Sequence, residues 1–188
     1  LFIEANKIGV NNILEISTKS TEEMGRKLSA FNLKIITKKY NNVFSVESAF
    51  QGSKVFENGG PYCDILTKDS YSAKKDLRIK ESGRLVRFEF FQEKFPLEPK
   101  TYFYDWLYIN ALHQNQELAK KIIDCQAFSD IEFNHLKSIN CQAFSAALYV
   151  TLSNNLLLDK ALKSKSDFLE IVSDIYDNSY AKSNDNLI

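Results

Sequence analysis

The alternation of apolar and polar residues predicts a chain that is mostly helical, with a few short strands. Apolar runs and alternating patterns predict strands at 13–17, 33–37 and 84–91. Apolar residues at helical spacing predict helices at 20–28, 45–57, 70–80, 101–113, 115–126, 139–152 and 166–177. A capping box, Ser20 followed by Glu23, starts the first of these helices. We therefore expect an α+β fold that is predominantly helical.

The breaks between these elements are short, and none of them suggests a second domain. Turn-forming residues stand at 40–42 and 58–61, and prolines interrupt the chain at 96 and 99. The length of 188 residues is ordinary for one domain. We expect a single domain over 1–188, with a core at about 12–177 and a polar C-terminal tail at 178–188 that frays.

Charged residues balance to a formal net charge of zero, from 24 basic and 24 acidic side chains. Proteins that grip nucleic acid by the charge of their whole surface are usually strongly basic, so this balance argues against that class. One run, 68–87, is locally basic, with seven Lys and Arg residues against three acids. It is either a solvated surface segment or a rim that attracts phosphates.

Cysteine and histidine are scarce, with three Cys, none in a Cys-x-x-Cys pair, and two His. This argues against a disulfide framework or a zinc site and favours buried thiols in a reducing compartment. The stretch 138–158 is uncharged, but its eight Ser, Thr, Asn and Gln residues suit a buried helix better than a bilayer. We expect a cytoplasmic protein without a membrane segment, a metal or a cofactor.

The predicted helix 45–57 places three polar residues on one face. Glu47, Gln51 and Lys54 stand at i, i+4 and i+7. One explanation is structural, because Ser45 suits the N-cap and the two charges suit the helix dipole. The other is chemical: the acid and the amine are about 10 Å apart along the axis, too far to pair directly, so they could flank one ligand.

These residues resemble the signature of the NADAR family, Glu-x-x-Phe-Gln-x-x-Lys, matched here by Glu47, Phe50, Gln51 and Lys54. Upstream, 28–31 is similar to that family's Phe-Ser-x-Phe element. Further segments resemble one branch, the NADAR proteins encoded beside DarT-class toxins that ADP-ribosylate DNA: 14–20, 59–62, 103–108, 130–134 and 138–142. The resemblance spans roughly 12–155.

The resemblance implies an ADP-ribosyl glycohydrolase that removes ADP-ribose from guanine bases in DNA and acts as the antitoxin of a DarT-class toxin. The implied partners are ADP-ribosylated DNA and the cognate toxin. Two alternatives stay open. One is a NADAR-type N-glycosidase that acts on a free nucleotide metabolite, as some relatives are associated with riboflavin-pathway intermediates. The other is a non-catalytic module that binds ADP-ribose.

Three residues are the catalytic candidates for such a reaction. Glu47 would stabilise positive charge at the ribose anomeric carbon and manage a proton. Lys54 would either attack that carbon and form a Schiff base, or stay charged and hold a phosphate. Asp130 is the best second carboxylate, unless it is only a surface acid.

The remaining candidates would bind the substrate. Backbone N–H groups of Thr18, Lys19 and Ser20 suit the pyrophosphate, if this turn is more than an ordinary helix cap. Trp106 either stacks on a base or belongs to the core. Gln51 would hydrogen-bond ribose hydroxyls or the departing base. The set of expected substrate-binding residues is Thr18, Lys19, Ser20, Ser29, Phe31, Gln51, Tyr62, Trp106 and Asn140.

Overall fold

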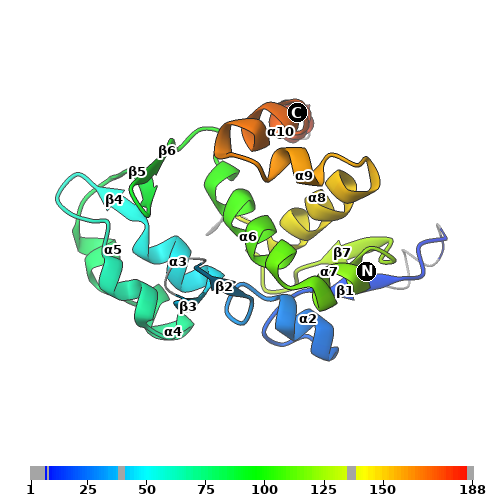
Figure 1. Ribbon diagram of the computed structural model, residues 1–188, viewed down its shortest axis with the longest axis horizontal. Helices are drawn as coiled ribbons and strands as arrows, with labels where there is room; N and C mark the ends of the chain where they lie inside the picture. The colour runs from blue at the N-terminus through cyan, green and yellow to red at the C-terminus, as the bar shows by residue number, and fades with distance from the viewer. Residues whose placement is uncertain (1–6, 8, 38–40, 135–138, 186–188) are drawn as a thin grey trace.

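The computed structural model describes residues 7, 9–37, 41–134 and 139–185, with side chains described as far as Tyr176. Helices provide most of the regular structure, and the strands are three to six residues long (Figure 1). The expected α+β, predominantly helical fold is therefore confirmed. No helix in the described part of the chain is long and apolar enough to cross a membrane.

The strands form small sheets that join distant parts of the chain. β1 (Ile13–Glu15) pairs in parallel with β7 (Ala127–Ser129), which brings the start of the described chain beside a much later segment. The remaining strands are antiparallel: β2 (Lys34–Ile36) pairs with β3 (Val43–Ser45), and β5 (Leu85–Phe90) lies between β4 (Lys54–Phe56) and β6 (Glu93–Phe95).

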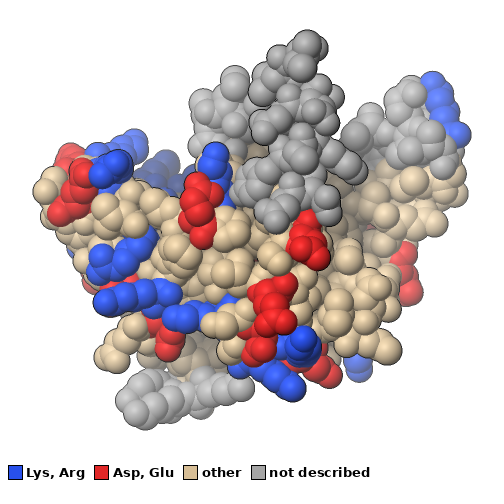
Figure 2. All heavy atoms as spheres, turned by 90° about the horizontal axis from the view of Figure 1, so that it is seen from above, with Lys and Arg blue, Asp and Glu red and all other residues tan. Residues whose placement is uncertain are grey.

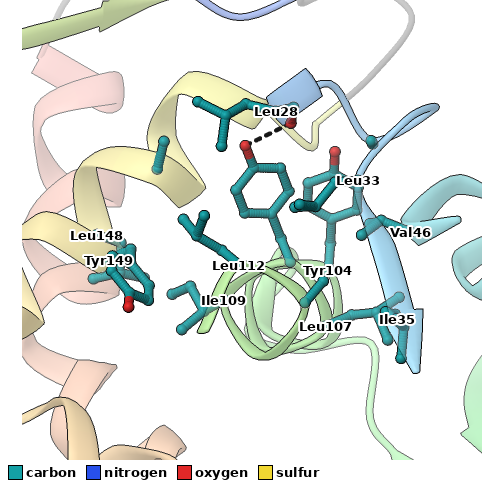
Figure 3. Close-up of a cluster of buried hydrophobic side chains, with 14 of the residues drawn as sticks. Leu28, Leu33, Ile35, Val46, Tyr104, Leu107, Ile109, Leu112, Leu148 and Tyr149 are labelled. Carbon is teal, nitrogen blue, oxygen red and sulfur yellow. Dashed lines mark hydrogen bonds between the residues drawn. The ribbon is translucent and has the colours of Figure 1, made fainter. Parts of the chain in front are cut away.

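Helix α6 (Tyr102–Gln114) runs through the core and is buried on most sides. It packs against α8 (Gln142–Asn154), against β2 and against α3 (Val46–Gly52). Figure 3 shows Leu107, Ile109 and Leu112 of α6 inside this cluster, where the Tyr108 hydroxyl donates to the carbonyl of Leu28 at 2.8 Å. The site described below lies where α3 meets this core.

The predicted helix 45–57 is too long, because α3 ends at Gly52. Glycine is a poor helix former, and Ser53 closes the helix by donating both its N–H and its hydroxyl to the carbonyl of Ala49. The next three residues form β4 and pair with β5. Lys54 therefore belongs to a strand, and its side chain approaches Gln51 from there.

Other elements also differ from the prediction. The capping box is wrong, because α2 (Glu23–Leu28) has Glu22 at its N-cap, without a side-chain cap. The basic helix 70–80 is two helices, α4 (Ser70–Lys74) and α5 (Arg78–Glu81), since the Asp76 carboxylate accepts the Arg78 N–H and interrupts the first. α10 (Lys165–Asp185) continues well past 177, and 186–188 lie outside the described residues. The other helices are η1 (Cys63–Thr67), α7 (Gln116–Ile122) and α9 (Leu158–Ala161).

The expectation that the thiols are buried holds for one cysteine of three. Cys125 is buried, Cys141 is half-buried and Cys63 is exposed. Cys63 begins the short η1 turn on the surface, which the sequence pattern did not predict.

A buried acid joins three helices at one end of the core. Asp105 of α6 is 1% exposed, and its carboxylate accepts hydrogen bonds from Ser145 of α8 at 2.6 Å and from Tyr176 of α10 at 3.0 Å. Burial raises the pKa of Asp105 to about 6, against the lowering effect of these hydrogen bonds. The folded protein therefore binds a proton here more tightly than the unfolded chain does.

Asp105→Asn is expected to flatten the dependence of stability on pH. The contribution of the raised pKa is fully present below the ordinary value of about 4 and is lost as the pH rises through about 6. The stability of the wild type relative to the variant should fall by about 2 kcal/mol between pH 4 and pH 7. Urea unfolding at both pH values measures this, with Asp174→Asn on the exposed side of α10 as control. Parallel pH profiles for wild type and Asp105→Asn would contradict it.

Candidate active site

Helix α3 is wholly buried, and serine side chains fix its start. Ser45 caps the helix, since its Oγ accepts the Ser48 N–H at 3.0 Å. The Ser70 Oγ of α4 lies 2.7 Å from Ser45 Oγ, and the Ser48 hydroxyl donates to the carbonyl of Lys68 at 2.9 Å. These bonds satisfy the buried polar groups and hold α3 rigidly against α4.

Glu47, Gln51 and Lys54 form a single chain of hydrogen bonds. Gln51 Nε2 donates to Glu47 Oε1 at 2.9 Å, and Lys54 Nζ donates to Gln51 Oε1 at 2.7 Å. Glu47 and Gln51 are each only 7% exposed. The amide of Gln51 thus stands between the carboxylate and the amine, and it holds both at the edge of the core.

Lys54 is half-buried, and its amine lies beside an aromatic ring. Its Nζ lies 4.8 Å from the centroid of the Phe50 ring. Burial lowers the pKa of Lys54 to about 8, although the nearby charge of Glu47 raises it, and the charge of Lys74 lowers it further. A substantial fraction of this lysine is therefore neutral near pH 8, the form in which an amine acts as a nucleophile.

A second chain of hydrogen bonds joins Glu47 to Asp130. The Glu47 N–H donates to the carbonyl of Ala30 at 2.9 Å, and the Ala30 N–H donates to Gln142 Oε1 at 2.6 Å. Gln142 Nε2 then donates to Asp130 Oδ2 at 3.0 Å. Sequence reasoning missed Gln142, although it falls in the family-like segment 138–142.

Asp130 has the features of a proton donor. Burial raises the pKa of its carboxyl above the ordinary value; the hydrogen bond from Gln142 opposes this shift, and the charge of Glu15 adds to it. Asp130 Oδ1 is buried and has no hydrogen-bond partner among the described residues. A buried oxygen without a partner is costly, so this atom is suited to meet a group of a ligand.

Tyr104 is the aromatic residue that the structure brings to the catalytic candidates. Its ring packs edge-on against Phe50, with the centroids 5.3 Å apart. Burial raises the pKa of the Tyr104 hydroxyl, and the charges of Glu47 and Asp130 add to it. Trp106 instead packs against the aromatic rings of β5 and β6. The family-like segment 103–108 indicated that an aromatic residue of this helix lies at the site. Its spacing does not show which aromatic residue that is.

The 29–31 segment borders the site through its backbone and one ring. Ser29 is buried, and its hydroxyl donates to the carbonyl of Arg26, so it holds the turn. Phe31 lies farther out, and Lys74 Nζ stands 5.2 Å from the centroid of its ring. The charge of the same Lys74 also contributes to lowering the pKa of Lys54.

Tyr62 approaches α3 with its backbone, while its side chain is turned to other partners. A Cβ added at Gly52 would stand only 3.2 Å from the Tyr62 carbonyl oxygen, so glycine allows the close contact there. The ring lies against the guanidinium of Arg78 at 4.4 Å, and the hydroxyl bonds to Ser82. Asn140 is half-buried just before α8.

A carboxylate occupies the turn predicted to bind pyrophosphate. The N–H and hydroxyl of Thr18 donate to Glu132 Oε2 at 3.2 and 2.8 Å, and Lys19 Nζ lies 3.0 Å from Glu132 Oε1. The Ser20 hydroxyl accepts the Glu22 N–H at 3.3 Å instead. A phosphate bound by Thr18 and Lys19 would have to displace Glu132, a residue that sequence reasoning left without a role.

Metal ligands are not grouped in the parts of the chain that the structure describes, since no three His, Cys, Asp or Glu side chains come together there. The candidate site is built from an amine, two amides and two carboxylates. This set is suited to acid–base and nucleophilic chemistry on a sugar.

Comparison with known proteins identifies the family. No curated protein matches the chain. A family model described as the DarT1-associated NADAR antitoxin matches residues 3–182, which include both hydrogen-bond chains of the candidate site. NADAR proteins are in general N-glycosidase-like hydrolases. The chain therefore belongs to the family of DarT1-associated NADAR antitoxins.

Proposed function

We propose that the protein hydrolyses the N-glycosidic bond between ADP-ribose and guanine in DNA, and so reverses the modification made by a DarT-class toxin. The observation that carries this proposal is the buried Lys54–Gln51–Glu47 chain, which sets a desolvated amine and a carboxylate on either side of one amide. The family match supports the antitoxin role.

The proposed reaction begins with the neutral amine of Lys54. Its Nζ bonds to the anomeric carbon of the ribose while the bond to the exocyclic guanine nitrogen breaks. The Glu47 carboxylate stabilises positive charge at that carbon and takes the proton that the amine loses. Asp130 supplies a proton to the departing guanine nitrogen. The sugar ring then opens: the C1–O4′ bond breaks, O4′ takes the proton held by Glu47, and Lys54 is left joined to C1 as a protonated imine. Water hydrolyses this imine, which releases ADP-ribose as the open-chain aldehyde, and the extra proton on Lys54 returns to Asp130.

Pairing of the basic run favours recognition through ADP-ribose and the modified base. Within 68–87, four of the seven basic side chains bond to acids: Lys68, Arg78, Arg84 and Arg87. Figure 2 shows Lys and Arg interspersed with Asp and Glu over the face in view. Few cations are left to neutralise phosphates, so we expect the rate to depend weakly on salt. The small number of free cations also agrees with the second candidate function, an N-glycosidase that acts on a free nucleotide metabolite.

The test is turnover of defined substrates. The protein is expected to release ADP-ribose from a single-stranded oligonucleotide that carries one guanine-linked ADP-ribose. Its rate of release from thymidine-linked ADP-ribose should be at least about a hundredfold lower. The two linkages differ because one leaving group is an exocyclic amine and the other a ring nitrogen between two carbonyls. Mass spectrometry of the restored base and the freed sugar measures both rates.

Three results would count against the proposal. Equal rates on the two linkages would remove the guanine specificity. Turnover of riboflavin-pathway intermediates in place of modified DNA would favour the metabolite N-glycosidase. Binding of ADP-ribose without turnover of any of these substrates would favour the non-catalytic module.

A further inference from the structure

An exposed tyrosine is held in a fixed position beside the candidate site. Tyr71 of α4 is 61% exposed, and its ring meets the Phe31 ring edge-on with the centroids 5.0 Å apart. Asp69 caps α4 by accepting the Tyr71 N–H at 3.0 Å, and Ser70 Oγ lies 2.8 Å from the carbonyl of Phe31. A large aromatic surface that is exposed on an anchored backbone is available to a ligand without much reorganisation.

The cations around this tyrosine differ from the rest of the basic run. Lys74, Lys75 and Lys80 are exposed, and among the described residues none of them has an acidic partner. Lys74 lies over the Phe31 ring. Aromatic rings interleaved with unneutralised lysines match the chemistry of a nucleic-acid strand, whose bases stack while its phosphates need cations.

This surface is continuous with the candidate active site. Ser70 of α4 bonds to Ser45, the N-cap of α3, and Lys74 of α4 lies over the ring of Phe31, next to the 29–31 segment that borders the site. A strand whose modified guanine enters at Lys54 would therefore pass Tyr71.

We propose that Tyr71 stacks on the DNA base next to the modified guanine, while Lys74 and Lys75 contact the adjoining phosphates. A guanine whose sugar adduct is drawn into a buried site must leave the base stack, and its neighbour then loses a stacking partner that the Tyr71 ring replaces. The inference rests on the proposed function, because it takes single-stranded DNA as the substrate. It assigns to α4 the recognition of the strand.

The test compares Tyr71→Ala with wild type on two substrates, an ADP-ribosylated guanosine and a nine-nucleotide strand with ADP-ribose on its central guanine. The alanine variant should lose at least about tenfold in kcat/KM on the strand and less than about twofold on the nucleoside. Tyr71→Phe keeps the ring and should retain wild-type rates on both. Leu77→Ala, which removes an exposed apolar side chain nearby, is the matched control.

The outcomes distinguish failure of this inference from failure of the proposed function on which it rests. An equal loss on both substrates would place Tyr71 in the binding of ADP-ribose itself, and no loss on either would remove it from recognition; both overturn the proposal. Absence of turnover by the wild type would overturn the proposed function alone. In that case, fluorescence anisotropy with the unmodified strand decides: weaker binding by Tyr71→Ala supports the stacking role, and unchanged binding overturns it.

Discussion

Glu47→Gln is expected to reduce the release of ADP-ribose by at least about a thousandfold while the protein remains folded. Glutamine has nearly the same shape, and its amide oxygen can still accept the hydrogen bond from Gln51 Nε2. What disappears is the negative charge that we propose stabilises positive charge at the anomeric carbon. The pKa of Lys54 should fall further in the variant, because the charge of Glu47 raises it in the wild type.

Rates on the guanine-linked oligonucleotide and thermal melting measure the two halves of this prediction. Glu57→Gln is a suitable control, since Glu57 is exposed and pairs with Arg84 on the surface. The control should keep its activity, and both variants should melt within a few degrees of the wild type. Near-normal turnover by Glu47→Gln would exclude the carboxylate from the mechanism.

Lys54→Arg is expected to be inactive although it preserves the charge. The guanidinium stays protonated and cannot act as a nucleophile, whereas the lowered pKa of Lys54 leaves part of the lysine neutral. Borohydride added during turnover should reduce the imine and fix ADP-ribose to residue 54 of the wild type, as peptide mass mapping would show. The wild-type rate should rise with pH and level off above about 8, because the neutral fraction increases through that pKa.

Lys120→Arg provides the control for the trapping experiment, since Lys120 is an exposed lysine of α7, outside the candidate site. It should react and be trapped like the wild type. An active Lys54→Arg enzyme that yields no adduct would show that the side chain at 54 holds a phosphate instead.

The fold class and the family could be predicted from the sequence because both depend on patterns that extend over many residues. The apolar periodicity of 101–113 and 139–152 locates α6 and α8 to within a few residues. β3, β6 and β7 were not predicted, because three residues alone are too short to show a period, and these strands form only where a partner strand is present. β4 was not predicted for the same reason: its three residues stand at the end of a stretch with helical spacing. β1 and β2 are equally short, but they lie within the longer apolar or alternating stretches 13–17 and 33–37.

Site residues followed a similar rule. Glu47, Gln51 and Lys54 stand close in the chain, so a local motif could indicate them. Gln142 reaches Ala30 and Asp130 only after α8 has packed against the loop that precedes β2, a contact between parts of the chain 112 residues apart. Such long-range bonds leave no trace in local spacing, and they decide which of several neighbouring polar or aromatic side chains faces the reaction.

If the pyrophosphate of the substrate binds at the Thr18–Lys19 turn, the carboxylate of Glu132 would compete with it while attached to the same chain. A group attached to the same chain is present at its own binding site at an effective concentration in the ~mM range, without any free ligand. Inorganic phosphate and common nucleotides at lower concentrations would therefore be excluded from the turn. A substrate anchored at Lys54 would be tethered in turn and could compete on equal terms, but it loses that advantage when the bond to the lysine is hydrolysed. Return of Glu132 to Thr18 would then help to expel the cleaved sugar nucleotide and prepare the site for the next one.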